Sequence, residues 1–301
     1  MLLQVLVQLT AVVTLMLAVS TVVLIGRYRL RDTRLEWRDR VRATAPITIV
    51  LALVLLFNGV ARDWVPDVSL MIGWHVTELI YDVEQYVILW LQSQATPELT
   101  AYFSFIYIYG YVFLLVFPLV AYFALSNTRP LRELLTAYTL NYVLGLCCYA
   151  LVVAYGPRNI MPDLVQPLLY DTYPQYQHLT RQVNRNTNVF PSLHTSLSAT
   201  VAFLAYRTRR IYPTWAVLAT IFALSIGIST MYLGIHWVID VLAGVGLAAV
   251  SVALSGHLVG RFSISAWLEN HVPSSDRIGT TDRPRDAPER TTESTVSSED
   301  E

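Results

Sequence analysis

The chain has 301 residues, of which 54% are hydrophobic and 14% are charged, and its formal net charge is −1. Soluble domains usually carry about a quarter of charged residues, so the composition argues against a soluble globular protein. A net charge close to zero also argues against nucleic acid as a partner. The two cysteines, Cys147 and Cys148, are neighbours inside an apolar run, which indicates packing residues and no disulfide framework.

Long apolar runs follow one another along the chain. A membrane-spanning helix needs about 20 apolar residues. The first run has no basic residue before it and no small-residue cleavage site, which favours an uncleaved span over a signal peptide. The sequence therefore predicts an all-α polytopic membrane protein with about seven transmembrane helices. The runs cover residues 3–25, 45–61, 101–125, 133–155, 192–206, 213–231 and 237–259.

Two further segments differ from these runs. Residues 67–92 mix Trp, Tyr and Leu with Asp and Glu, which favours an amphipathic helix in the membrane interface over an eighth span. Residues 260–301 are rich in Ser, Thr, Pro, Asp, Glu and Arg, and a segment of this composition is expected to be disordered. The Tyr-rich stretch 102–113 is interpreted as interface belt and helix packing.

Arginine placement predicts the orientation. The chain has no lysine, and its arginines gather in the connections 27–42, 129–132 and 207–210. With seven spans these connections lie on one side, which the positive-inside rule assigns to the cytoplasm. We therefore expect a plasma-membrane protein with its amino terminus outside and its tail in the cytoplasm.

The motif "FPSLH" precedes the fifth run. Pro191 suits the opening of a helix, and Ser192 lies where backbone N–H groups are unpaired. Such a helix terminus with a hydroxyl beside it is an anion site, and His194 in the first turn is able to face the same anion. By itself, the short motif is explained by default as a capping serine next to an incidental histidine.

The second motif is "STMYLGIHWVID", where the sixth run meets the seventh. His236 and Asp240 are four residues apart and are expected to stack on one helix face. A carboxylate that binds one imidazole nitrogen leaves the other free to attack. The alternative is that the pair only caps the helix. Because His194 and His236 both fall at outward-facing ends, the predicted topology brings the two motifs to one membrane face.

Together these motifs resemble the type 2 phosphatidic acid phosphatase (PAP2) superfamily, and more specifically its inositol phosphorylceramide synthase branch. Ser229, His236 and Asp240 fall in register with the last superfamily motif, while Thr230 replaces an arginine that the synthase branch also lacks. The resemblance implies a six-helix core, a phosphohistidine intermediate on His236, and no metal or cofactor. It also implies a lipid phosphate or phospholipid substrate, processed by a phosphotransferase or a phosphatase.

The resemblance further assigns roles to single residues. His194 would be the general acid, Asp240 would orient His236, and Ser192 with the helix terminus would hold the phosphate. Tyr232 and Ser229 are candidate substrate contacts. The first superfamily motif needs a lysine, which the chain lacks, so Arg158 is favoured as phosphate ligand over Arg129, and Arg181 and Arg185 come next.

These inferences divide the chain into N-terminal spans with an interfacial helix (1–100), a catalytic core (101–259) and a cytoplasmic tail (260–301). A membrane protein without enzymatic activity, such as a transporter or scaffold, is one alternative, although a transporter would be expected to have ionisable or Gly/Pro-broken positions near mid-span. A metal site formed by His194, His236 and Asp240 is another, and it predicts that a chelator abolishes activity.

Overall fold

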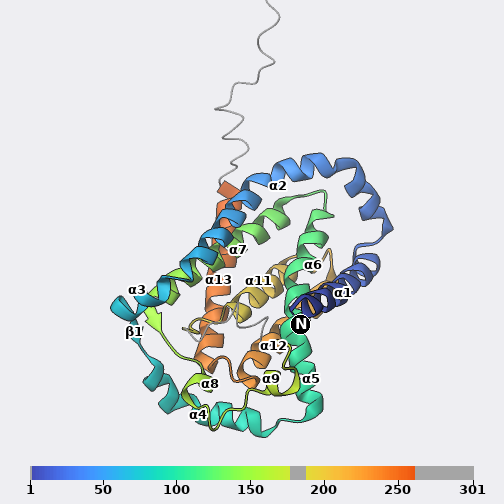
Figure 1. Cartoon of the computed structure of the whole chain (residues 1–301). Helices are drawn as coiled ribbons and strands as arrows, with labels where there is room; N and C mark the ends of the chain where they lie inside the picture. The colour runs from blue at the N-terminus through green and yellow to red at the C-terminus, as the bar shows by residue number, and fades with distance from the viewer. Residues whose placement is uncertain (1, 177–187, 262–301) are drawn as a thin grey trace, which may run out of the picture. The chain divides into compact units, whose positions relative to one another are not determined.

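The computed structural model describes residues 2–176 and 188–261, all of which belong to the compact unit Met1–Ser263. Within them, six helical segments are long and apolar enough to cross a membrane. The prediction of an all-α membrane protein is therefore confirmed. The six segments are α1 (Leu2–Ser20) continued by η1 (Thr21–Ile25), α2 (Arg27–Ala61), α5 (Pro97–Phe105) continued by η2 (Ile106–Gly110) and α6 (Tyr111–Phe123), α7 (Arg129–Leu151), α12 (Pro213–Tyr232) and α13 (Val238–Arg261), shown in Figure 1.

The fifth apolar run forms α11 (Leu193–Arg207), which has 15 residues. At 1.5 Å per residue it is about 22 Å long, shorter than the roughly 30 Å of a bilayer core. It is the central helix of the unit, packed against α7, α12 and α13, and ten of its residues are buried. On α7, Asn141 Nδ2 donates to Thr200 Oγ1 at 3.0 Å, and Asn141 Oδ1 accepts from Ser196 Oγ. Side-chain amides and hydroxyls thus join α11 to its neighbour.

The predicted interfacial segment 67–92 is divided between two helices. They are α3 (Val65–Ile72) and α4 (Thr77–Ser93), separated by the two-residue strand β1 (Trp74–His75). This strand pairs in parallel with β2 (Val152–Val153) after α7. The short helices α8 (Pro157–Ile160) and α9 (Leu168–Thr172) follow β2. The segment that leads from α7 back toward α11 is therefore tied to the segment before α4.

The arginine-rich stretch 27–42, which the sequence analysis treats as a connection, is helical in the structure. It forms the first half of α2, and only the second half is the predicted span 45–61. Glu36 and Arg40, four residues apart, form an ion pair at 2.9 Å, a pairing that stabilises a helix. Arg40 also donates to the carbonyl of Phe123 at 2.8 Å, where α6 ends.

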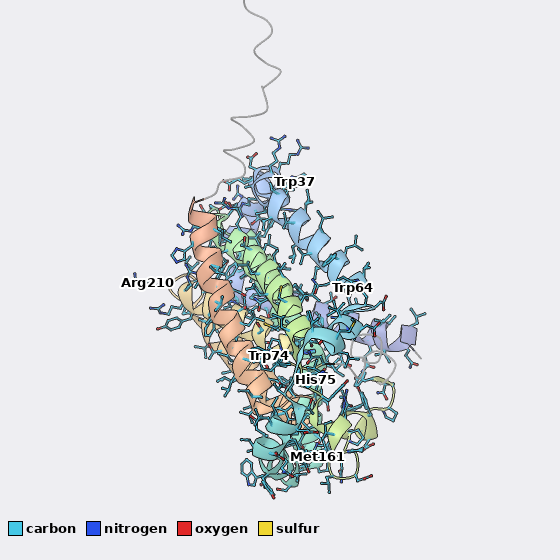
Figure 2. The ribbon with its side chains drawn as sticks, turned by 90° about the vertical axis from the view of Figure 1, so that its left-hand side faces the viewer. Trp37, Trp64, Trp74, His75, Met161 and Arg210 are labelled. Carbon is cyan, nitrogen blue, oxygen red and sulfur yellow. The ribbon has the colours of Figure 1, made fainter. Side chains whose placement is uncertain are left out.

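The three arginine-bearing segments meet at one end of the unit. The guanidinium of Arg29 lies 4.6 Å from the centre of the Tyr212 ring. The buried carboxylate of Glu133 binds Arg129 at 2.8 Å and Arg207 at 3.2 Å. Trp37, inside the arginine-rich part of α2, and Met161, beside α8, lie toward opposite ends in Figure 2.

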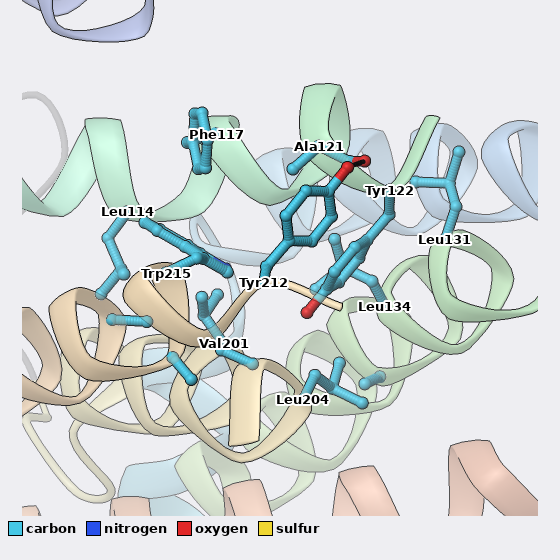
Figure 3. Close-up of a cluster of buried hydrophobic side chains, with 14 of the residues drawn as sticks. Leu114, Phe117, Ala121, Tyr122, Leu131, Leu134, Val201, Leu204, Tyr212 and Trp215 are labelled. Atoms are coloured by element: carbon cyan, nitrogen blue, oxygen red, sulfur yellow. Dashed lines mark hydrogen bonds between the residues drawn. The ribbon is translucent and has the colours of Figure 1, made fainter. Parts of the chain in front are cut away.

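An aromatic core joins α6, α7, α11 and α12 near this end (Figure 3). The rings of Phe117 and Trp215 are 4.6 Å apart, and both side chains are fully buried. Tyr212 donates its hydroxyl hydrogen to the carbonyl of Ala121 at 3.0 Å. The phenol groups thus satisfy backbone groups while their rings fill the space between the helices.

We predict that Phe117→Ala lowers the stability of the protein by about 3–5 kcal/mol, because it leaves a cavity beside Trp215. Phe57→Ala is the matched control, since this phenylalanine is 53% exposed on α2. The midpoint of thermal unfolding in detergent micelles measures both. Equal shifts for the two variants would contradict the assignment of Phe117 to the core.

Candidate active site

His236 lies in the turn, residues 233–237, that joins α12 to α13. The carbonyl of Thr230 accepts the N–H groups of Ile235 at 2.9 Å and His236 at 3.1 Å. Gly234 has a φ of +69°, a left-handed conformation that favours glycine. These features make a tight turn that fixes the backbone of His236. The histidine precedes α13 by two residues, so it does not share a helix face with Asp240 in the expected way.

The His236–Asp240 pair nevertheless meets, because Asp240 lies in the first turn of α13. Its Oδ2 accepts the N–H of Trp237 at 2.8 Å and lies 3.4 Å from Nδ1 of His236. The carboxylate is fully buried, and its Oδ1 has no hydrogen-bond partner among the described residues. With Nδ1 facing the carboxylate, the Nε2 atom of His236 is the nitrogen available for chemistry.

His194 reaches the same site from α11. The centres of the His194 and His236 rings are 6.5 Å apart. Ser192 caps α11, since its Oγ accepts the N–H of Thr195 at 3.3 Å. Its own N–H donates to the backbone carbonyl of Asp240 at 3.0 Å. One hydrogen bond thus links the start of α11 to the start of α13 and sets the spacing of the two histidines.

Two tyrosines of the third span hold the His194 ring. Tyr107 stacks on it at 4.9 Å between ring centres, and Tyr111 contacts it at 4.6 Å. Tyr107 belongs to η2, a π-helical turn inside the span, and such turns occur frequently at functional sites. Sequence reasoning assigned these residues to the interface belt and packing. No compositional signal marks a π-helical turn.

Two arginines, Arg158 and Arg62, are candidates for supplying positive charge to the site. The backbone N–H of Arg158 donates to the carbonyl of Gly234 at 3.1 Å, and its guanidinium lies 5.3 Å from the centre of the Tyr170 ring. The charge of Arg158 has a secondary electrostatic effect on Tyr107, after burial, and the charge of Arg62, directly after α2, has a minor effect on His194, after burial and His236. The sequence analysis missed Arg62. Arg129, by contrast, begins α7 at the end opposite to β2.

The remaining predicted residues have other contacts. Ser229 is buried, and its hydroxyl donates to the carbonyl of Ile226 in its own helix. The buried Tyr232 shares a hydroxyl–hydroxyl hydrogen bond of 2.7 Å with Thr100 on α5. Arg181 and Arg185 lie outside the described residues. For all these residues, contact with substrate stays a prediction.

A carboxylate that the sequence analysis did not single out lies behind the His236–Asp240 pair. Glu84 on α4 accepts the N–H groups of Val238 at 2.6 Å and Ile239 at 3.0 Å, the first two residues of α13. Burial raises the pKa of Glu84 above its ordinary value, and the Asp240 carboxylate acts in the same direction. The two N–H groups oppose this shift in pKa because they stabilise the ionised form.

Across residues 2–176 and 188–261, no group of three or more His, Cys, Asp or Glu side chains is arranged to hold a metal ion. His194, His236 and Asp240 therefore do not form the three-ligand site that the metal alternative requires. The site offers instead two imidazoles, one buried carboxylate and a helix amino terminus, with arginines nearby.

Comparison with known protein families identifies the superfamily of the chain. A family model described as the PAP2 superfamily matches residues 77–254, more than half of the chain. The chain belongs to the PAP2 superfamily. Its members are all-α membrane proteins that are generally phosphatases or phosphotransferases. Neither a search of curated proteins nor a search of solved structures finds a match. The region matched to the PAP2 superfamily begins at the first residue of α4 and includes Glu84, His194, His236 and Asp240.

We predict different effects on stability for two alanine substitutions that test the turn 233–237. Gly234→Ala imposes a left-handed alanine, which costs about 1–2 kcal/mol, and its Cβ would lie 2.4 Å from Val165. Gly246→Ala is the matched control, because its Cβ meets nothing within 4 Å and alanine favours a helix by about 0.5–1 kcal/mol. Thermal unfolding should show a lower midpoint for the first and an unchanged or higher midpoint for the second. A fall for both would contradict the turn.

Proposed function

We propose that this protein is a lipid phosphoryl-transfer enzyme that works through a phosphohistidine on His236. The observation that carries the proposal is the arrangement of three side chains. Nδ1 of His236 faces the buried Asp240 carboxylate at 3.4 Å, and the His194 ring is centred 6.5 Å from the His236 ring. A nucleophile, its orienting carboxylate and a second imidazole are the parts that a two-step group transfer needs.

The reaction has two balanced steps. In the first, Nε2 of His236 attacks the phosphorus, the bond from phosphorus to the leaving oxygen breaks, and His194 donates a proton to that oxygen. In the second, a water or alcohol oxygen attacks the phosphorus, the N–P bond breaks, and His194 takes the proton of the incoming hydroxyl. Asp240 keeps the proton of His236 on Nδ1 and stabilises the positive charge that forms on the imidazole.

The phosphate is held by the amino terminus of α11 together with Arg158. Unpaired N–H groups at a helix start favour an anion, and an arginine binds phosphate with two parallel hydrogen bonds. Arg185 and the Ser192 hydroxyl are further ligands in this proposal. Thr230 occupies the place of the superfamily arginine, and its hydroxyl donates to the carbonyl of Gly227. The charge of the phosphate must therefore be met by arginines on other segments.

The motif that begins at Ser229 favours transfer over hydrolysis, because it is similar to the inositol phosphorylceramide synthase branch. The acceptor would then be a lipid alcohol or a polyol, whereas water would make the enzyme a lipid phosphatase. Either reaction takes place in this proposal at the outer face of the plasma membrane. The assignment to the outer face is supported by three arginines at the end of the unit opposite to His236, because the positive-inside rule places arginines in the cytoplasm. They are Arg29, Arg129 and Arg207.

We predict that His236→Ala abolishes headgroup exchange and phosphate release by purified protein in liposomes that contain EDTA. His194→Ala should lower the rate by about a hundredfold to ten-thousandfold, since it removes the general acid. His257→Ala is the matched control, because this histidine is exposed at the far end of α13. The product separates hydrolase from transferase.

Activity of His236→Ala equal to that of the wild type would disprove the nucleophile. Loss of the wild-type activity in EDTA would instead favour the metal alternative. A wild type that acts on no lipid phosphate would support a membrane protein without enzymatic activity.

We predict that Arg158→Ala lowers kcat/KM by roughly tenfold to a hundredfold, because a hydrogen bond to a charged phosphate is lost. Arg158→Lys should restore only part of this loss, since a lysine cannot bind two phosphate oxygens in parallel. Arg209→Ala is the control, as this arginine is exposed and contacts Tyr206 at the opposite end. Steady-state kinetics in liposomes measures all three. A normal kcat/KM for Arg158→Ala would remove this residue from the site.

A further inference from the structure

Helix α4 contacts both ends of the catalytic turn through two side chains. Glu84 accepts the N–H groups of Val238 and Ile239, where α13 begins. Gln92 donates from Nε2 to the carbonyl of Tyr232, where α12 ends, at 3.1 Å. Eight residues separate Glu84 from Gln92, which is about 12 Å along a helix. The turn that carries His236 is thus bounded on each side by a contact with the same helix.

The chemistry of each contact fits the helix end that it meets. The first N–H groups of a helix have no partner inside the helix and carry partial positive charge, so they favour a carboxylate such as Glu84. The last carbonyl groups carry partial negative charge and need a donor, which the amide of Gln92 supplies. An exchange of the two side chains would leave both helix ends without a suitable partner.

Gln92 is itself held in place by the segment before α9. Its Oε1 accepts the N–H of Gln166 at 2.9 Å, and its Nε2 also donates to the carbonyl of Gln166 at 3.1 Å. The opposite face of α4 is apolar and exposed, with Leu79, Val83 and Trp90 on it. Such a face suits the membrane interface. The helix therefore has one face for lipid and one face for the turn.

We propose that Glu84 and Gln92 are positioning residues, and that α4 clasps the turn 233–237 so that Nε2 of His236 stays aligned with His194. The inference rests on the proposed function, since the alignment matters for phosphoryl transfer. A displacement of about 1 Å costs roughly a hundredfold in rate. Neither side chain is among the phosphate ligands of the proposed function, so substrate binding should be unaffected.

The experiment uses the full chain in phosphatidylcholine liposomes with phosphatidate labelled by ³²P as the probe. Rapid quenching gives the rate constant of phosphoenzyme formation, and the amplitude gives the active fraction. Glu84→Gln and Gln92→Leu should lower the rate constant by about tenfold to a hundredfold, with KM and amplitude within twofold of the wild type. The controls are Glu78→Gln in α4 and Gln94→Leu directly after α4; both change exposed side chains, and Gln94 donates to Ser93 rather than to the turn.

The outcomes separate positioning from folding. A smaller amplitude with an unchanged rate constant means that the variant is only less stable, and it overturns the proposal. Rate constants within twofold of the wild type for both Glu84→Gln and Gln92→Leu overturn it as well. An equal fall in the rate constant for the two controls would also overturn the proposal, because the effect would then not be specific to Glu84 and Gln92.

Hydrogen exchange of residues 233–241 distinguishes failure of this inference from failure of the proposed function. Glu84→Gln should speed exchange at Val238 and Ile239 by about tenfold, and Glu78→Gln should leave it unchanged. If the wild type forms no phosphoenzyme but Glu84→Gln alone speeds the exchange, the proposed function is wrong while the role of α4 in fixing the turn is supported. If exchange is the same in both variants, the clasp itself is wrong.

Discussion

The buried carboxylate of Asp240 is the group on which the arrangement of the site depends. A charge removed from water is costly unless it is paired and hydrogen-bonded. Here the amino terminus of α13, the N–H of Trp237 and the imidazole of His236 all stabilise it. The same residue accepts the N–H of Ser192 through its backbone carbonyl. Its side chain therefore orients one histidine, and its backbone sets the distance to the element that carries the other.

This link requires α11 to approach α13 closely. A Cβ on Gly244 would lie 2.6 Å from the carbonyl oxygen of Ser192, so only glycine allows the contact. Small and hydroxylated residues let membrane helices pack closely and join by hydrogen bonds. Along α11 this pattern continues in the buried Ser196 and Thr200, both bonded to Asn141. Polar packing inside the unit, rather than length, determines the place of this short helix.

The sequence was informative where the signal is local. Apolar runs gave the long helices, and the four-residue spacing of His236 and Asp240 indicated their contact. Glu84 escaped notice because its partner Val238 is 154 residues away, and a lone glutamate on an amphipathic helix is usually solvated. Tyr107 was missed because a π-helical turn has the composition of any apolar helix. Arg62 follows a span, where a basic residue has an ordinary explanation as a flanking charge.

The contact of α2 with α7 shows that the packing around the candidate site extends beyond the region matched to the family. The matched family region begins at residue 77, so it excludes α2 altogether. Yet α2 packs along α7, which itself packs against α11, the helix that carries His194. A fragment trimmed to the family boundaries would expose the side of α7 that α2 covers. The packed unit around the candidate site is therefore larger than the segment by which the family is recognised.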